Sequence, residues 1–378
     1  MSRSIQPEEI RVFPLATRPS DICIEDVARD PAAAPPDAAA LNNAIDDLAE
    51  RIVRARRQGA AVMLTYGAHL IKNGGGTLVN ALMDGGWLTH VATQGAGVIH
   101  DWEFAFQGKT SESVRANAPI GRFGAWDETG RAINLAALSG ACDGLGLGES
   151  IGRFIQEDGP TLPDAGALAA LIAENPEHPL TAARADLLAA MRRFDLPAGK
   201  TDIPHLFKQY SVPTHAYARD IPFTVHPGIG YDIYTNHPLF HGGALGRTAA
   251  QDARTFARST ETLSGGVYLS VGSAIMSPQV FEKAFSLANN VREQQSLPYI
   301  NNHTIAVVDL QDDSGWNWSR GEPPKHHPAY YLRFLKSFHR LGGDMMYLNG
   351  DNCLVLHNLL ERLRRRSGGT VKSSMKSM

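Results

Sequence analysis

Glycine, histidine and acidic residues recur directly after short apolar runs in this 378-residue sequence. Each run suits a buried strand, and each is followed by a turn and then by helical periodicity. The carboxyl ends of parallel strands gather at one edge of a sheet, where α/β proteins bind ligands, so residues at these ends are candidates for a site. They are Tyr66 to His69, Thr93 to Gly97, His100 and Asp101, His226 to Asp232, Gly272 to Ala274, and Asp309, Asp312 and Asp313.

These residue types suit particular ligands. Glycines let a backbone approach a cofactor closely, and the helix N-termini that follow offer free N–H groups to phosphates. The acids suit a ribose or a cationic substrate. A GxGxxG motif is absent after the first strand, and the glycines of Gly144 to Gly148 follow no convincing strand, so they are more typical of a flexible turn.

Two further groups of residues leave alternatives open. His226, Asp232, His237 and His241 have spacings that allow a metal site, although Pro238 interrupts any helix between the last two histidines. The alternative is that they are loop histidines with ordinary hydrogen bonds.

The segment 314–334 offers Trp316, Trp318 and Glu322 after Asp313. Aromatic faces beside carboxylates bind organic cations, whereas the alternative is a loop whose aromatic side chains simply pack.

The elements that would position these residues alternate between strand and helix. Apolar spacing predicts helices over 41–57 and 68–83, and strands are predicted within 221–230, 303–313 and near 267. This alternation predicts an α/β fold with a doubly wound, mostly parallel sheet. We expect an N-terminal extension over 1–40, a single domain over 41–364 with a helical insertion at about 108–205, and a disordered basic tail over 365–378.

Composition excludes several classes of protein. The formal charge is −3, with 36 Lys and Arg against 39 Asp and Glu. The sequence therefore lacks the excess of positive charge that is typical of nucleic-acid-binding proteins. No apolar run reaches the roughly 18 residues of a membrane span. The N-terminus lacks a signal-peptide pattern, and three cysteines without a CxxC pair argue against a disulfide framework. We therefore expect a cytoplasmic globular protein that binds neither membranes nor nucleic acid.

Four segments, in order, resemble those of the deoxyhypusine synthase family in its bacterial form. They are GAHLIKNGG (67–75), HVATQGAGVIHD (90–101), ARDIPFTVHPGIGYDI (218–233), and LSGGVYLSVGSAIM (263–276) followed by TIAVVDLQDDSG (304–315). The resemblance implies a Rossmann-like fold, NAD as cofactor and a homotetramer. It also implies oxidation of a polyamine to an imine and transfer of an aminobutyl group to an acceptor amine.

The resemblance and the strand-end positions together assign roles. Thr93, Gly95, Gly97, Asp101, Asp232, Gly272 and Ser273 are expected to hold NAD. Asp313, Trp316, Trp318 and Glu322 are expected to line the amine pocket, and His100 or His226 to act as general base. The family's imine-forming lysine has Lys336 as its nearest counterpart, whereas the family's histidine pair is replaced by Leu269 and Ser270.

Three functions follow. The first is an NAD-dependent transferase of amines that uses a small-molecule acceptor. The second is a metal-dependent hydrolase or lyase built on the three histidines and Asp232. The third is a catalytically degenerate protein that still binds NAD.

Overall fold

The computed structural model describes residues 4–366. The chain divides into two compact units. Unit 1 comprises the described residues up to Ala28 together with Ala92–Phe256, and unit 2 comprises Arg29–Val91 together with the described residues from Ala257 onward. The division into extension, single domain and insertion stays a prediction. The predicted tail lies outside the described residues except for Arg365 and Arg366, which end the last helix.

The main sheet has six strands in the order β10-β9-β8-β2-β3-β7. The pairs β10–β9, β9–β8 and β8–β2 are all parallel. The α/β fold with a mostly parallel sheet is therefore confirmed. The strands are β2 (Val62–Tyr66), β3 (His90–Gln94), β7 (Phe223–His226), β8 (Val267–Val271), β9 (Thr304–Asp309) and β10 (Asp344–Asn349).

The order of these strands matches that of a dinucleotide-binding Rossmann sheet, in which strand 1 lies between strands 2 and 4. Here β8, β9 and β10 take the places of strands 1, 2 and 3, and β2 takes the place of strand 4. The two halves of the sheet occur in the opposite order along the chain, since β2 and β3 precede β8. The topological switch point therefore lies where β2 and β8 end side by side.

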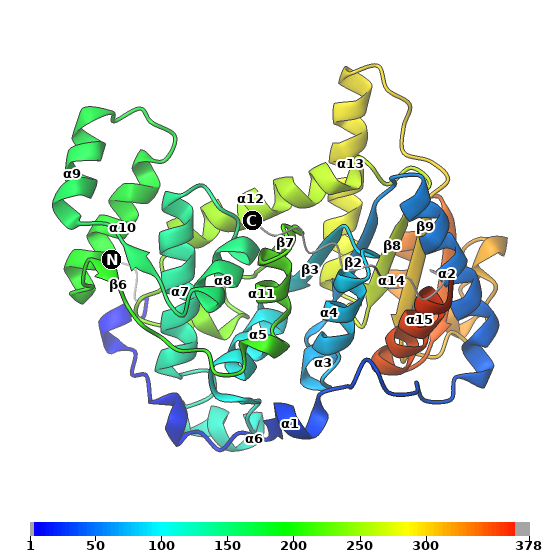
Figure 1. The fold of residues 1–378 in the computed structure, drawn as a ribbon, viewed down its shortest axis with the longest axis horizontal. Helices are drawn as coiled ribbons and strands as arrows, with labels where there is room; N and C mark the ends of the chain where they lie inside the picture. The colour runs from blue at the N-terminus through cyan, green and yellow to red at the C-terminus, as the bar shows by residue number, and fades with distance from the viewer. Residues whose placement is uncertain (1–3, 367–378) are drawn as a thin grey trace. The chain divides into compact units, whose positions relative to one another are not determined.

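The helices of unit 2 form two packed groups. Helix α15 contacts both α2 and α4, and α13 contacts α14. Figure 1 shows α2 and α15, in blue and red, lying side by side. The Tyr268 ring of β8 stacks on Phe281 of α13 at 3.9 Å between centroids. The bounds are α2 (Asn42–Arg57), α3 (Ala68–Lys72), α4 (Gly76–Asp84), α13 (Met276–Gln294), α14 (Arg333–His339) and α15 (Asn352–Arg366).

Unit 1 is largely helical. Its longer helices are α5 (Gly95–Gln107), α7 (Asp127–Cys142), α8 (Leu147–Gln156), α9 (Ala165–Glu174), α10 (Thr181–Phe194) and α12 (Gly242–Thr260, in this unit to Phe256). Its shorter ones are α1 (Ile24–Val27), α6 (Val114–Asn117) and α11 (Val212–Tyr217). Two small antiparallel ribbons pair β1 (Ile22–Cys23) with β4 (Lys109–Thr110) and β5 (Thr161–Leu162) with β6 (Gly199–Lys200).

Local sequence accounts for these elements. In α2 the residues Ile45, Leu48 and Ile52 are fully buried along one face, as helical spacing requires. The helix expected over 68–83 is instead two helices, because the chain turns at residues 73–75, where Gly74 has a φ of +74°.

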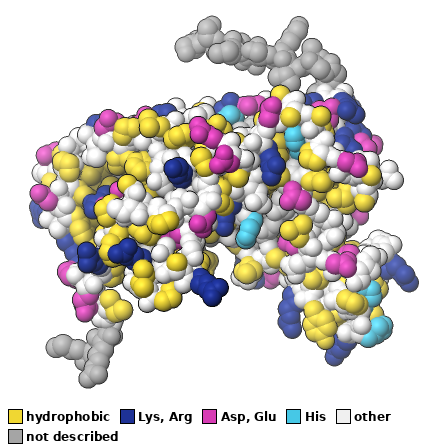
Figure 2. Space-filling view, turned by 90° about the horizontal axis from the view of Figure 1, so that it is seen from below, with side chains coloured by type: hydrophobic (Ala, Val, Ile, Leu, Met, Phe, Trp, Pro, Cys, Tyr) yellow, Lys and Arg dark blue, Asp and Glu magenta, His cyan; other side chains and the backbone are white. Residues whose placement is uncertain are grey.

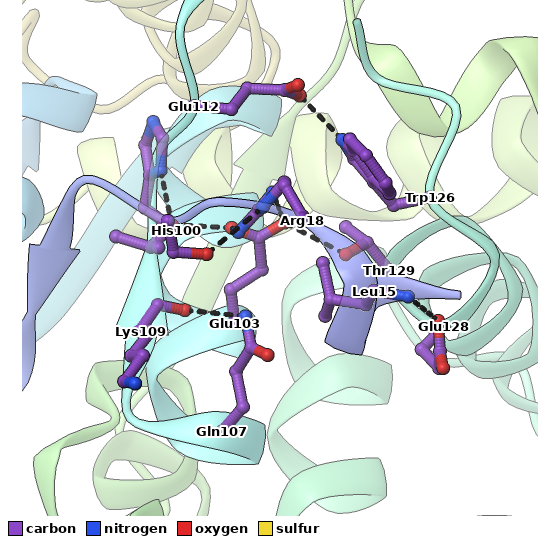
Figure 3. A network of polar contacts seen from close by, with 12 residues as sticks. Leu15, Arg18, His100, Glu103, Gln107, Lys109, Glu112, Trp126, Glu128 and Thr129 are labelled. Atoms are coloured by element: carbon purple, nitrogen blue, oxygen red, sulfur yellow. Dashed lines mark hydrogen bonds and ion pairs between the residues drawn. The ribbon is translucent and has the colours of Figure 1, made fainter. Parts of the chain in front are cut away.

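A buried ion pair joins the N-terminal segment to α5 in unit 1 (Figure 3). The two terminal guanidinium nitrogens of Arg18, Nη1 and Nη2, donate to the carboxylate of Glu103 at 2.8 and 2.7 Å. Thr110 and Thr129 donate to the same carboxylate at 2.5 and 2.9 Å. All the hydrogen-bonding capacity of this buried carboxylate is used within the protein.

The surface mixes charges of both signs. On the face drawn in Figure 2, Lys and Arg side chains are interspersed with Asp and Glu side chains, in keeping with the near-balanced totals of the sequence. No helix within residues 4–366 has both the length and the apolar character to cross a bilayer.

We predict that Arg18→Met lowers the free energy of unfolding by about 3–5 kcal/mol, because it leaves the Glu103 carboxylate buried without its cation. The control Arg365→Met removes an exposed pair with Glu361 and is expected to cost less than about 1 kcal/mol. Urea denaturation followed by circular dichroism measures both values. Equal losses in the two variants would contradict a structural role for the buried pair.

Candidate functional site

The ends of β2 and β8 approach each other closely within unit 2. The Gly67 N–H donates to the carbonyl of Val271 at 3.0 Å. A Cβ on Gly67 would lie 2.0 Å from the carbonyl oxygen of Gly272, far inside van der Waals contact. At the switch point, the backbone after β2 therefore touches the backbone after β8. Only glycine at position 67 allows this contact.

Gly272 begins the turn from β8 to α13 in the left-handed region, at a φ of +59°. A Cβ there would lie 2.3 Å from the side-chain nitrogen of Asn352, the first residue of α15. The Asn352 side chain is 8% exposed, and its Oδ1 has no hydrogen-bond partner. The hydrogen-bonding capacity of this buried oxygen at the carboxyl edge of the sheet is thus unused.

A chain of hydroxyl groups fixes the first turn of α13. The Ser273 hydroxyl accepts the N–H of Ser277 at 3.3 Å. The Ser277 hydroxyl lies 2.7 Å from that of Tyr268, which donates to Thr65 at 2.9 Å. These contacts attach the N-terminus of the helix to strands β2 and β8. By contrast, Ile275 in the preceding turn is 75% exposed.

Strand β9 ends at Asp309, whose carboxylate is half-buried and accepts the N–H of Gln311 at 3.0 Å. The next residue, Leu310, is 70% exposed. An acid followed by an exposed apolar residue thus lies one strand away from the β8 turn, since Val271 pairs with Val308 in the register of the two strands.

The side chains of the predicted amine pocket at 313–322 have partners within the protein, and their role in binding an amine stays a prediction. The Asp313 carboxylate accepts the indole N–H of Trp318 at 3.0 Å, and Trp318 is buried. The Trp316 indole donates to a main-chain carbonyl at 2.9 Å. Glu322 forms a bidentate ion pair with Arg340, with hydrogen bonds of 2.6 and 3.0 Å. These hydrogen bonds lower the pKa of Glu322. These groups already have partners.

Lys336 is buried on α14, and its ammonium group lies 3.6 Å from the centroid of the Tyr330 ring. This contact is a cation–π interaction. It accounts for the burial of the lysine, and the catalytic role expected for Lys336 stays a prediction.

In unit 1 the start of α5 lies against a carboxylate. A Cβ on Gly95 would lie 2.1 Å from Oδ2 of Asp232, and a Cβ on Gly97 would lie 2.1 Å from the hydroxyl of Thr93. Glycine is thus needed at both positions because a neighbouring side chain of the protein occupies the space that a Cβ would take. The structure brings Thr93, Gly95, Gly97 and Asp232 to one end of α5, and their role in holding NAD stays a prediction.

His100 and Asp101, expected just after the second apolar run, lie on α5. The Nδ1 of His100 is 2.8 Å from the hydroxyl of Thr110, within the Glu103 network of Figure 3. Asp101 is buried and accepts the N–H of Val212 at 2.9 Å, while its Oδ1 has no partner. Burial raises the pKa of Asp101 to about 7.

His226, the other residue expected to act as general base, ends β7. Its ring meets that of Phe256 edge-on, at 5.2 Å between centroids. Burial lowers the pKa of His226 to about 4, so the ring is neutral at pH 7, and its role as general base stays a prediction.

The histidines considered for a metal site have separate partners. His237 lies 3.0 Å from Asp127, and His241 lies 3.7 Å from Asp186. Among residues 4–366, no group of three or more His, Cys, Asp and Glu side chains is arranged to hold a metal ion. The geometry of the described chain gives the metal-dependent alternative no support.

The sequence analysis assigned no role to Asn352. It follows β10 in the run Asn349-Gly-Asp-Asn352, which is a strand-end signal of the same kind as the others. Its contact with Gly272 depends on the order of the strands, which spacing along the chain does not reveal.

No protein-family model and no curated protein matches the sequence. Among solved structures, AgrE in complex with ornithine and NAD+ is 14% identical, covering 89% of this chain and 35% of that chain, with a TM-score of 0.45. ArgZ, an arginine dihydrolase from the ornithine–ammonia cycle in cyanobacteria, is 14% identical, covering 86% and 33%, with a TM-score of 0.41. The chain thus spans about a third of the length of AgrE and ArgZ.

A conserved putative LOR/SDH protein from Methanococcus maripaludis S2 is also 14% identical, covering 88% of this chain and 74% of that chain, with a TM-score of 0.41. With these similar structures and no matching family model, the prediction of the deoxyhypusine synthase family is wrong. The matched motifs were short strand-end segments with glycines, which parallel α/β sheets share for steric reasons. Aminobutyl transfer rested on that resemblance and is withdrawn with it.

We predict that Gly67→Ala destabilises the protein by about 3 kcal/mol or more, because its Cβ collides with a main-chain carbonyl that cannot move without displacing β8. The matched control is Gly246→Ala in helix α12, where no atom lies within 4 Å of the new Cβ. There we expect no loss of stability, since alanine favours a helix. Thermal unfolding compares the two variants, and a Gly67→Ala protein as stable as the control would refute the close contact.

Proposed function

We propose that this protein is an NAD-dependent enzyme that acts on a small amine or amino acid, with the dinucleotide bound at the turn from β8 to α13. The observation that carries the proposal is the strand order, which places this turn at the topological switch point of a Rossmann-type sheet. Ligands of open α/β sheets bind at such a point, beyond the carboxyl ends of the strands.

The turn itself suits a pyrophosphate. It runs from Gly272 to the first residues of a 19-residue helix, α13, whose N-terminus presents the positive end of a helix dipole to a phosphate. The Ser277 hydroxyl contact with Tyr268 holds this helix end in place before a ligand arrives. Preorganised donors lose less entropy when they bind.

The end of β9 suits the adenosine part of the cofactor. In Rossmann domains an acid at the end of the second strand binds the ribose hydroxyls, and Asp309 holds that position here. Exposed Leu310 and Ile275 offer apolar surface to an adenine ring. The buried Oδ1 of Asn352 supplies a further acceptor for a ligand hydroxyl or amide.

The acids after β9 favour NAD over NADP. Asp312 and Asp313 follow Asp309 within four residues, so a 2′-phosphate at this position would meet several negative charges. When bound, NAD would supply the hydride acceptor for oxidation of an amine.

We predict that Asp309→Asn weakens NAD binding about tenfold and narrows the preference for NAD over NADP, because the ribose loses a charged hydrogen-bond acceptor. Isothermal titration calorimetry with each dinucleotide measures both effects. The control Asp202→Asn makes the same charge change on an exposed residue of unit 1 and is expected to bind as the wild type does.

An unchanged NAD affinity in Asp309→Asn would place the ribose elsewhere, and a wild-type protein that binds neither dinucleotide would overturn the proposed function. Turnover is tested by following the absorbance of reduced cofactor with NAD and a panel of putrescine, spermidine, ornithine and arginine. NAD binding without turnover on any amine would favour the degenerate cofactor-binding protein instead.

A further inference from the structure

We propose that Asp232 and the segment 227–231 preceding it form a recognition site for the ammonium group of a short aliphatic amine or amino acid. This site lies within unit 1. It rests on the proposed function only for the reaction that follows, because binding of the amine requires no cofactor.

Within residues 4–366, the carboxylate of Asp232 is buried without a cation beside it. Asp232 is 3% exposed, and its two donors, the N–H of Gly228 at 2.7 Å and the hydroxyl of Tyr234 at 3.2 Å, both reach Oδ2. Among residues 4–366, no Lys, Arg or His side chain forms an ion pair with it. Its Oδ1 is thus left to accept a hydrogen bond from a ligand.

The negative charge of Asp232 also favours a cationic ligand. Burial raises the pKa of Asp232 to about 6, while the two donors on Oδ2 oppose that rise. At pH 7 the group is therefore mostly ionised. A desolvated carboxylate without a cation is costly, and groups of this kind are concentrated at functional sites. An ammonium ion bound at Oδ1 would remove that cost.

The position of the carboxylate is fixed rather than accidental. It lies against the first residue of α5, where a Cβ on Gly95 would come within 2.1 Å of Oδ2 and 2.5 Å of Oδ1. Any other residue at position 95 would push the carboxylate away. The 13-residue helix α5 also presents the positive end of its dipole here, which favours the ionised form.

The segment in front of Asp232 suits the hydrocarbon part of an amine. Ile229 is 66% exposed and Tyr231 is 72% exposed, and these two large apolar side chains lie three and one residues before Asp232 in the chain. The ring of Tyr231 lies on Gly228, where a Cβ would meet it at 1.8 Å. An aromatic face beside a carboxylate binds an alkylammonium ion, and the isoleucine covers methylene groups.

The other candidate for amine binding is less suitable. Glu322 holds its two oxygens on Arg340, so an ammonium ion would have to displace a guanidinium. Asp232 has no such competitor. The two carboxylates therefore give distinct predictions.

We predict that the full-length wild-type protein binds putrescine and ornithine in calorimetry, and that Asp232→Asn weakens this binding at least about tenfold. The asparagine keeps an oxygen for the Gly228 N–H but loses the charge. Butane-1,4-diol, which has the same length without charge, is expected not to bind. The control Asp220→Asn changes an exposed acid of the same unit and is expected to retain binding.

Further variants keep the test decisive if Asp232→Asn is unstable. Tyr231→Ala removes an exposed side chain and is expected to weaken binding several-fold without lowering the melting temperature. Loss of binding in Glu322→Gln but not in Asp232→Asn would move the site to the loop after β9 and overturn the inference. Failure of the wild type to bind either amine at up to about 10 mM, with or without NAD, would also overturn it.

NAD titration of the same proteins separates the two proposals. Asp232→Asn that binds NAD normally but not the amine supports both. A wild type that binds amines but not NAD overturns the proposed function and leaves the amine site standing.

Discussion

The contact between Gly67 and the carbonyl of Gly272 is the constraint on which the arrangement of unit 2 depends. It lets β2 and β8 end side by side, where the chain continues from β2 into α3 and from β8 into α13. Because a Cβ at position 67 has no room, the carboxyl edge of the sheet is bordered there by backbone rather than by side chains. A backbone edge of this kind lets the pyrophosphate of a dinucleotide approach closely.

The glycines at strand ends have two kinds of explanation, and the structure separates them. Gly95, Gly97 and Gly272 each face a side chain of the protein itself, namely Asp232, Thr93 and Asn352. None of them needs a ligand to account for it. Four other features support a dinucleotide site: the strand order, the anchored N-terminus of α13, the acid at the end of β9 and the unpartnered oxygen of Asn352.

Sequence patterns predicted those parts of the molecule that depend on local spacing. The helix expected over 41–57 is α2, and the apolar runs are the strands of a mostly parallel sheet. Contacts between residues far apart in the sequence could not be predicted from the spacing of residues along the chain. The pairing of Glu322 with Arg340 and the placement of Asn352 against Gly272 both depend on the tertiary fold. The family resemblance failed for a related reason, since short glycine-containing segments report a steric need that many α/β sheets share.

Binding of a dinucleotide at the turn from β8 to α13 can be observed in solution. Hydrogen–deuterium exchange of the full-length protein, measured by mass spectrometry with and without NAD, tests it most directly, because bound phosphates slow the exchange of the amides they contact. We expect NAD to slow the exchange of residues 272–278 and 309–313. Binding of NAD with slower exchange confined to the glycine-rich turn at 144–148, or no change at 272–278, would contradict it.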